Sequence, residues 1–186
     1  MSLARTASQT IGPFYNFSLL GDADNDLTRR SKDGPLAAGN IVEIKGRIID
    51  GDGKPCACAL VEVWQADAEG RYGADSDPNF SGFGRTLTDD DGYYVFTTVF
   101  PGPVPGKGNA WQAPHISMSL HSGGLLKQLN TRVYFPNDKA NEDDPVLSGI
   151  ADEGMRSTLV ASVTGECQYT FDVILQGEGE TVFFQL

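Results

Sequence analysis

The residues with the clearest chemical potential lie in the stretch NAWQAPHISMSL, residues 109–120, which holds one of only two histidines in the chain. Residues at i and i+2 of a strand face the same side, so a His-x-His pair there would present two imidazoles to one metal ion. Tyrosine phenolates could complete a hard ferric site around such a pair. Here the pair is His115-x-Ser117, and serine is a poor substitute for a neutral nitrogen donor. Residue chemistry alone therefore favours a structural histidine at position 115.

Other polar stretches offer weaker chemistry. His121 opens the stretch HSGG and is expected to face solvent in a turn. The acidic stretch from Asp22 to Asp33 begins like a calcium loop, but Leu27 stands where the sharp turn of an EF-hand needs glycine. The stretch GEGE at 177–180 has no helical pattern after it that would offer an N-terminus to a phosphate. A Ser-His-Asp triad lacks a GxSxG elbow to expose its serine.

Charge and cysteine usage narrow the class of protein. The 186 residues include 14 Lys and Arg against 25 Asp and Glu, a net charge of -11, which argues against binding nucleic acid. No apolar run approaches the roughly 18 residues of a membrane span, and the first residues lack the apolar core of a signal peptide. The odd set Cys56, Cys58 and Cys167 does not suit a disulfide framework. We expect a cytoplasmic protein whose three cysteines are small buried hydrophobic residues.

Period-two alternation and turn residues predict mostly strands. Residues 1–39 are polar and Gly-rich without a sustained period, and they are expected to form an extended arm that packs on the body or on a partner. Residues 40–186 are expected to form a single β-sandwich domain. The predicted strands are residues 40–50, 58–66, 93–100, 115–120, 128–135, 168–176 and 181–184. The proline-rich residues 101–109 are expected to be an irregular loop, because proline cannot donate to a ladder. Residues 152–162 hold the only plausible helix.

Many short strands with Gly, Asp and Pro turns and little helix predict an all-β fold, a sandwich or a barrel. The length suits one well-cored domain. No repeat period and no linker divides the body.

Several segments, in order along the chain, resemble the intradiol ring-cleavage dioxygenases. They are SQTIGPFY (8–15), VEVWQADAEGRY (61–72), GFGRTLTDDDGYYVFTTVFPGPVP (82–105), APHISMSL (113–120), NTRVYF (130–135) and QGEGETVFF (176–184). The resemblance covers nearly the whole chain, and it is strongest to the alpha subunits of heteromeric members that cleave protocatechuate.

The resemblance implies a β-sandwich and, in the catalytic chains, a non-haem Fe(III) held by two tyrosines and two histidines. The first tyrosine corresponds to Tyr72 and the first histidine to His115. The second tyrosine falls on Val104 and the second histidine on Ser117. The arginine that precedes the histidines corresponds to Gln112. We refer to these five positions as the vestigial site.

The resemblance further implies that this chain binds no metal and catalyses nothing alone. A homologous beta chain would carry the Fe(III) and pair with this chain into αβ units of a larger oligomer. The complex would cleave protocatechuate with O2 to 3-carboxy-cis,cis-muconate. Two other interpretations remain open, namely an autonomous iron dioxygenase and a β-sandwich module that binds a ligand without chemistry.

The resemblance also assigns a role to the N-terminal arm. In this family the alpha-chain arm reaches the partner's active-site cavity, so Thr10, Gly12, Pro13 and Phe14 would line that cavity, with the glycine allowing close backbone approach. Arg132 would place a planar guanidinium near the substrate carboxylate. The alternatives are an arm that only packs on the partner and an Arg132 that pairs with a local acid.

Overall fold

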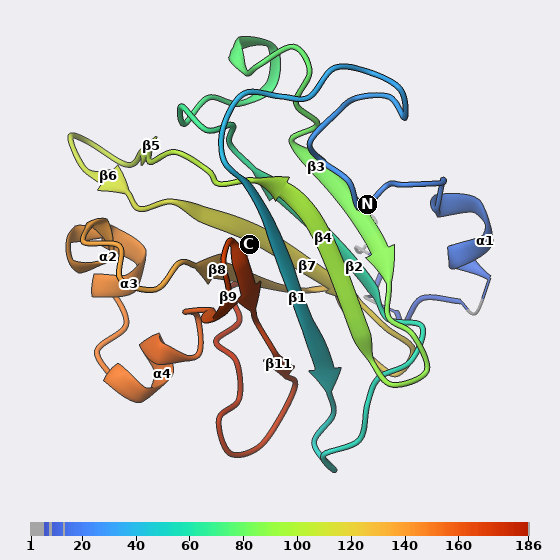
Figure 1. Ribbon diagram of the computed structural model, residues 1–186. Helices are drawn as coiled ribbons and strands as arrows, with labels where there is room; N and C mark the ends of the chain where they lie inside the picture. The colour runs from blue at the N-terminus through green and yellow to red at the C-terminus, as the bar shows by residue number, and fades with distance from the viewer. Residues whose placement is uncertain (1–5, 8, 13, 186) are drawn as a thin grey trace, which may run out of the picture.

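The chain forms two β-sheets packed face to face, with short helices at both sides of the sandwich (Figure 1). The structure is a computed structural model that describes residues 6–7, 9–12 and 14–185. The predicted all-β sandwich is confirmed. None of the helices in these ranges combines the length and apolar character that crossing a bilayer requires.

The first sheet is built around β1 (Ile41–Ile49). This strand pairs antiparallel with β4 (Tyr93–Val99) at one edge. At its other edge it pairs parallel with β10 (Gln168–Thr170) and then β11 (Val173–Ile174), and β9 (Ser162–Gly165) continues beyond β10.

The second sheet has the strand order β3-β2-β7-β8 and is antiparallel throughout. Its strands are β3 (Phe83–Leu87), β2 (Leu60–Gln65), β7 (His115–His121) and β8 (Leu129–Tyr134). β3 was not expected as a separate strand. Because β7 carries two vestigial-site positions, this sheet is the platform of the candidate site.

The core lies between the two sheets and follows from the alternation in the sequence. Val42, Ile44 and Ile48 are buried from β1 as the pattern predicts. The facing sheet contributes a matching apolar set, Val61, Val63, Ile116, Met118, Leu120 and Val133. A second, smaller cluster of Ala113, Tyr134, Leu147 and Leu159 lies under the helices beyond β8.

The helices of the described chain are all short. α2 (Ala140–Asp143), α3 (Pro145–Ser148) and α4 (Glu153–Ser157) gather at one side of the sandwich, and α1 (Tyr15–Leu19) lies at the opposite side (Figure 1). A 3-10 turn, η1, covers Gly73–Asp75. The predicted helix in residues 152–162 is confirmed by α4, although Ser162 already belongs to β9. The other helices were not predicted, because none is long enough to show a helical period.

Two strand predictions need correction. Residues 168–176 form two strands because the chain breaks at Asp172, whose Oδ1 accepts the backbone N–H of Arg47 at 2.8 Å in place of a ladder carbonyl. Residues 181–184 form only an isolated bridge, in which Phe184 donates its N–H to the carbonyl of Asn130.

The loop prediction for residues 101–109 is also partly wrong. Val104–Pro105 forms β5, which pairs with β6 (Trp111–Gln112) as a two-stranded ribbon. Proline is tolerated there because each strand of such a ribbon is an edge strand, and an edge does not need every N–H. This ribbon carries two of the vestigial-site positions.

The predictions for the cysteines and for His121 are wrong as well. Cys58 and Cys167 are exposed, each at a positive φ in a turn, and only Cys56 is partly covered. His121 ends β7 and is half-buried, with its Nε2 3.5 Å from Glu62 Oε2.

The N-terminal segment is not extended throughout. α1 interrupts it, and the Tyr15 hydroxyl donates to the carbonyl of Cys58. Leu27 is fully buried in the main core, and its N–H donates to the Thr97 carbonyl at 2.8 Å. The later part of the segment therefore packs on the sandwich.

Candidate functional site

The loop that carries Tyr72 is organised by one buried carboxylate, Asp67. Its Oδ1 accepts the backbone N–H groups of Glu69 and Arg71, at 3.0 and 2.9 Å. Its Oδ2 accepts the N–H of Asp77 at 2.9 Å and pairs with the Arg71 guanidinium at 3.1 Å. Burial alone would raise the pKa of Asp67, but these donors together hold it below its ordinary value. A single side chain thus shapes the turn that leads into Tyr72.

The Tyr72 loop rests directly on the proline loop. Gly70 has φ +76°, and a Cβ added there would lie 2.0 Å from the Pro103 carbonyl oxygen. Gly102 donates its N–H to the Asp67 carbonyl at 2.9 Å. Only glycine allows this backbone approach. The contact fixes the two loops that carry Tyr72 and Val104 against each other.

Val104 is buried, with 4% of its surface exposed, and it lies opposite Gln112 in the β5-β6 ribbon. Three residues after the end of the ribbon comes His115, the first residue of β7. The ribbon therefore brings Val104 and Gln112 to the entrance of the strand that carries His115 and Ser117.

His115 is buried, and its ring makes a structural hydrogen bond. Nδ1 lies 2.7 Å from the Ala113 carbonyl oxygen, which can only accept, so the proton is on Nδ1. Burial is the main cause and lowers the pKa of His115; the hydrogen bond to the Ala113 carbonyl opposes it, Arg132 adds to the lowering, and Asp144 has the smallest effect, which raises the pKa. The ring is therefore neutral at pH 7. This geometry agrees with the structural histidine that residue chemistry favours.

Arg132 on β8 stands at the centre of the group. Its Nη1 donates to Gln112 Oε1 at 2.6 Å and to the Tyr134 hydroxyl at 3.3 Å. Its charge also lowers the pKa of Tyr72, although burial dominates and leaves that pKa raised overall. The guanidinium therefore lies beside Gln112 and Tyr134, and Arg132 pairs across the sheet with Ser117.

Asp144 connects Tyr134 and the residues before His115 to the N-terminus of α3. It is fully buried and caps α3, accepting the N–H groups of Val146 and Leu147 at 2.8 and 3.0 Å. It also accepts the Tyr134 hydroxyl at 3.2 Å and the Ala113 N–H at 2.8 Å. Burial raises the pKa of Tyr134 far above its ordinary value, although Arg132 opposes this. Tyr134 is therefore a neutral phenol that joins Arg132 to Asp144.

Strand pairing places Ser117 beside the other residues of the site. It pairs with Trp64 on β2 and with Arg132 on β8. The Trp64 ring stacks on the Tyr72 ring with centroids 5.8 Å apart and an angle of 14°. The structure thus brings together all five vestigial-site positions and adds Arg132, Tyr134 and Trp64.

These residues do not fit a Fe(III) ion. Val104 has no donor atom, a serine hydroxyl is a weak ligand, and the Arg132 guanidinium places a positive charge among them. Among the described residues, no three His, Cys, Asp or Glu side chains gather as a metal site would need.

The arm residues lie at the other end of β7. Thr10 Oγ1 accepts the Gly124 N–H at 3.0 Å, in the turn between β7 and β8. Gly12 has open space where a Cβ would stand, and Phe14 is 74% exposed. Pro13 lies outside the described residues. Among residues 6–7, 9–12 and 14–185, no hydrogen bond or ion pair joins the arm to Arg132, and the roles of both toward a partner's cavity stay predictions.

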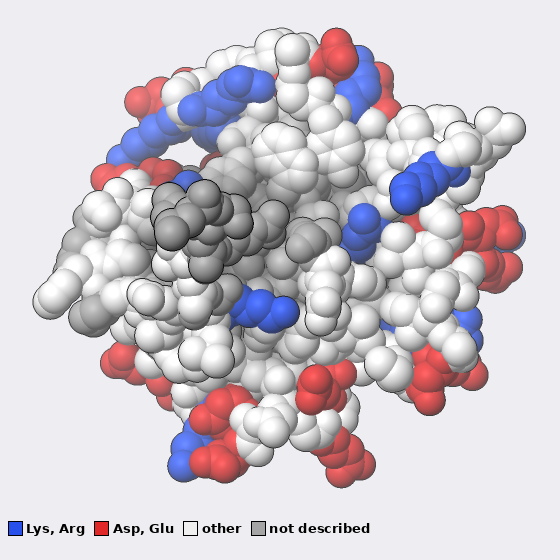
Figure 2. Space-filling model, turned by 180° about the vertical axis from the view of Figure 1, so that it is seen from behind, with Lys and Arg blue, Asp and Glu red and all other residues white. Residues whose placement is uncertain are grey.

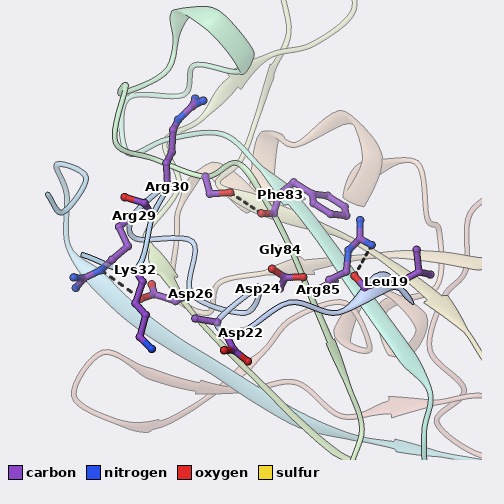
Figure 3. Close-up of a pocket in the computed structure, with 13 residues that line it drawn as sticks. Leu19, Asp22, Asp24, Asp26, Arg29, Arg30, Lys32, Phe83, Gly84 and Arg85 are labelled. Atoms are coloured by element: carbon purple, nitrogen blue, oxygen red, sulfur yellow. Dashed lines mark hydrogen bonds and ion pairs between the residues drawn. The ribbon is translucent and has the colours of Figure 1, made fainter. Parts of the chain in front are cut away.

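A separate cleft of about 480 Å³ separates the N-terminal segment from β3 (Figure 3). Its charges largely satisfy each other or the backbone. Arg29 Nε lies 3.5 Å from Asp26 Oδ2, and Arg85 Nη1 donates to the Leu19 carbonyl at 2.9 Å. We interpret this cleft as the seam where the N-terminal segment docks on the sheet.

Sequence reasoning missed Tyr134 and Asp144. Tyr134 lies inside the quoted segment NTRVYF, and its position two residues after Arg132 on a strand placed it on the same face. Asp144 precedes a proline, as a helix N-cap does, but nothing in the sequence indicates that this short helix covers the site.

The fold and this grouping of tyrosine, histidine and proline-loop residues define a β-sandwich of the intradiol dioxygenase class. Comparison with known proteins agrees. The protocatechuate 3,4-dioxygenase alpha chain of Pseudomonas putida is 39% identical over 194 residues, covering 98% of this chain and 96% of that one. The beta chain of Burkholderia cepacia protocatechuate 3,4-dioxygenase is 37% identical, covering 91% and 78%.

Among solved structures, 3-chlorocatechol 1,2-dioxygenase from Rhodococcus opacus 1CP superposes with a TM-score of 0.63 at 20% identity, covering 94% of this chain and 68% of that one. This likeness shows the fold. The family described as Dioxygenase matches residues 11–177. The chain belongs to this dioxygenase family, whose members are oxidoreductases, and it is homologous to protocatechuate 3,4-dioxygenase alpha chains.

Proposed function

We propose that this chain is the non-catalytic alpha subunit of a heteromeric Fe(III)-dependent protocatechuate 3,4-dioxygenase. A homologous beta chain would supply the iron and the reacting centre, and the αβ unit would cleave protocatechuate with O2 to 3-carboxy-cis,cis-muconate. This chain would contribute structural support and part of the cavity wall. The observation that carries the proposal is the joint replacement of two ligand positions by Val104 and Ser117, with a guanidinium beside them.

The homology supports the partnership, because the beta chain and the alpha chain of Burkholderia cepacia protocatechuate 3,4-dioxygenase are each 37% identical to this chain. Two chains with one ancestral fold can associate through related surfaces while only one keeps the metal ligands. An autonomous iron dioxygenase would need donors at positions 104 and 117. A ligand-binding module without chemistry would need no homologous partner.

The arm is the part of the chain proposed to reach the partner. Near its start the described part of the arm is attached to this chain by the Thr10 bond to Gly124 and the Tyr15 bond to Cys58. Its later part packs on the sandwich through Leu27, so the residues before α1 are the ones proposed to extend toward the partner. In the proposed assembly Thr10, Gly12, Pro13 and Phe14 would line the partner's cavity.

The first test is the iron content and visible spectrum of this chain alone and of the chain co-expressed with the homologous beta chain from the same genome. We expect the lone chain to be colourless and iron-free. We expect the complex to hold one iron per αβ unit, to absorb in the visible range and to cleave protocatechuate. One iron and turnover in the lone chain would overturn the proposal, and so would a failure of the two chains to associate.

Arg132→Ala tests the finer assignment to the substrate carboxylate. If Arg132 reaches the partner's cavity, the variant complex will keep its iron and show a raised KM for protocatechuate. An unchanged KM would remove Arg132 from that cavity while leaving the subunit assignment intact.

A further inference from the structure

β9 presents an open edge of the first sheet. One side of this strand pairs antiparallel with β10, and Ser162, Val163 and Thr164 are all exposed. Alternate residues of an antiparallel strand direct their N–H and C=O groups away from the strand they pair with. Outside the β9-β10 ladder, no backbone–backbone hydrogen bond within residues 6–7, 9–12 and 14–185 involves residues 162–165. The outer backbone groups of β9 therefore have no backbone partner in the described chain.

The other outer strands of the two sheets are bonded to further segments of the chain. Thr97 on β4 accepts the N–H of Leu27 at 2.8 Å. Arg85 on β3 donates its N–H to the Asp24 carbonyl at 2.9 Å. Residues 181–184 bond to β8 and to β11. Among the strands at the edges of these sheets, β9 is thus the one that the described residues leave open.

The side chains of β9 do not protect this edge. Natural sheets guard open edges with Lys, with Pro or with inward-pointing charges. β9 reads SVTG, and residues 157–165 contain no charged residue and no proline. Val163, a β-branched apolar residue suited to strands, is 57% exposed. The strand is short and its pairing with β10 shifts register near Tyr169, which limits open-ended stacking. The edge therefore suits one short and specific pairing.

Charge and symmetry favour a second copy of this chain as the partner. The chain has a net charge of -11, and Asp and Glu side chains stand around much of the outline of the molecule seen from behind (Figure 2). Two copies therefore repel each other in most orientations, and contact costs least where neither copy contributes charge. A strongly charged partner would find no charge to pair with on residues 157–165. A second β9 matches the first in length and in its lack of charge.

We propose that β9 pairs antiparallel with β9 of a second copy, so that the first sheet continues across a two-fold axis. In the register that sets the two Val163 side chains opposite each other, each exposed valine covers the other. Ser162 of one protomer then lies opposite Thr164 of its partner, and the outer N–H and C=O groups bond across the axis. Association ends at two copies, because each copy has used its open edge.

This surface includes neither the vestigial site nor the arm, so it goes beyond the proposed function. In an assembly of αβ units the same pairing would join two units through this chain. The lone chain tests the pairing without iron and without a beta chain.

The test is analytical ultracentrifugation of the lone full-length chain over a range of concentrations, where we expect a monomer–dimer equilibrium. Val163→Glu should raise the dimer dissociation constant about tenfold or more, because like charges directly opposite each other destabilise paired strands. Val163→Lys should do the same. An equimolar mixture of the two variants should dimerise again, since opposite charges then meet across the axis. This rescue requires that position 163 meets itself in the dimer.

Val95→Glu is the matched control, because Val95 is also an exposed valine of the first sheet, 38% exposed, but lies on the covered strand β4. It should dimerise like the unaltered chain. Circular dichroism will show whether each variant is folded. Hydrogen exchange of the unaltered chain is a second measurement that needs no variant. Amides of residues 162–165 should exchange more slowly as the concentration rises, whereas those of residues 93–99 should not change.

Three results would overturn the proposal. They are a chain that stays monomeric at every concentration, a dimer that Val163→Glu leaves intact, and a mixture of the Glu and Lys variants that stays monomeric. None of them bears on the proposed function, which the iron content of the complex tests.

Discussion

Arg132 Nη1 donates to Gln112 Oε1 at 2.6 Å, which joins β8 to the β5-β6 ribbon across the vestigial site. By the family resemblance, Gln112 stands where catalytic chains have an arginine. The cation has therefore not disappeared from the site but comes from another strand. Its new position is opposite Ser117, where the resemblance would place the second histidine ligand.

This position predicts that restoring the missing ligands will not be enough to restore a metal site. We expect the double variant Val104→Tyr, Ser117→His to hold much less than one iron per chain. Adding Arg132→Gln should raise the iron content several-fold, because it removes a positive charge that would repel the metal ion. Metal analysis and the visible absorption of an iron phenolate would measure the iron content of the double variant and of the triple variant.

Adding Arg47→Gln to the double variant is the control for a general loss of positive charge, and it should leave the iron content unchanged. A double variant that already binds one iron per chain would show that Arg132 does not exclude the metal.

The approach of Gly70 to Pro103 predicts a costly substitution. Gly70→Ala combines a positive φ with a Cβ placed 2.0 Å from the Pro103 carbonyl oxygen. The backbone conformation alone costs about 1–2 kcal/mol for alanine, and the clash must add to this. Gly53→Ala is a matched control, since Gly53 has φ +77° but nothing within 4 Å. Urea unfolding should show that Gly70→Ala lowers the free energy of unfolding by distinctly more than Gly53→Ala does. Equal losses would mean that the two loops are free to separate.

The Asp67 network predicts a pH-dependent contribution to stability. Asp67→Asn should lower the free energy of unfolding by about 2–3 kcal/mol at pH 7, since it removes an acceptor of charge-assisted bonds in a buried place. The folded-state pKa of Asp67 is lowered, so its contribution is complete above the unfolded value of about 3.9. It is lost as the pH falls through the folded value. Urea unfolding at pH 7 and near pH 3 should therefore show the variant's deficit shrinking in acid.

Asp75→Asn, an exposed substitution in the same loop, is the control for this experiment. This variant should have nearly the same free energy of unfolding as the unaltered chain at both pH values. A deficit at Asp67→Asn that does not change with pH would mean that the carboxylate charge is not what stabilises the loop.

The sandwich was predictable because its strands follow simple physical rules. β1 alternates Val42, Ile44 and Ile48 with polar residues, and a strand with one buried face must do so. The break at Asp172 was not predictable, because it depends on a side-chain oxygen that reaches a neighbouring strand's N–H. The exposure of Cys58 and Cys167 was likewise not predictable from the sequence. Both lie in turns at positive φ, where burial does not follow from residue type.

Some features of the candidate site were also predictable from the sequence, and others were not. The positions Tyr72, Val104, His115 and Ser117 could be found from sequence because long flanking segments fix the alignment with the family. The contact of Arg132 with Gln112 could not, because it joins residues twenty positions apart, and the ribbon that positions Gln112 was not predicted: its first strand lies within residues 101–109, which were expected to be an irregular loop. Strand pairing supplies the missing information, since register alone sets Ser117 between Trp64 and Arg132.

Asp144 and Asp152 give the last prediction, because both cap short helices but only one is buried. Asp144 is 0% exposed and accepts four donors, two of them outside its own helix. Asp152 is exposed and accepts the Met155 N–H at 2.9 Å. Asp152→Asn should cost less than about 1 kcal/mol, since asparagine also caps helices.

Asp144→Asn should cost about 3 kcal/mol or more, because an amide NH2 would face N–H donors without water to relieve it. Urea unfolding measures both losses. The near-ultraviolet circular dichroism of Tyr134 should change with the Asp144 substitution alone, since the carboxylate holds its hydroxyl. Similar losses for the two variants would mean that Asp144 acts only as a helix cap. The anchoring of the Ala113–His115 segment would then have to come from the strand pairing of β7 rather than from this carboxylate.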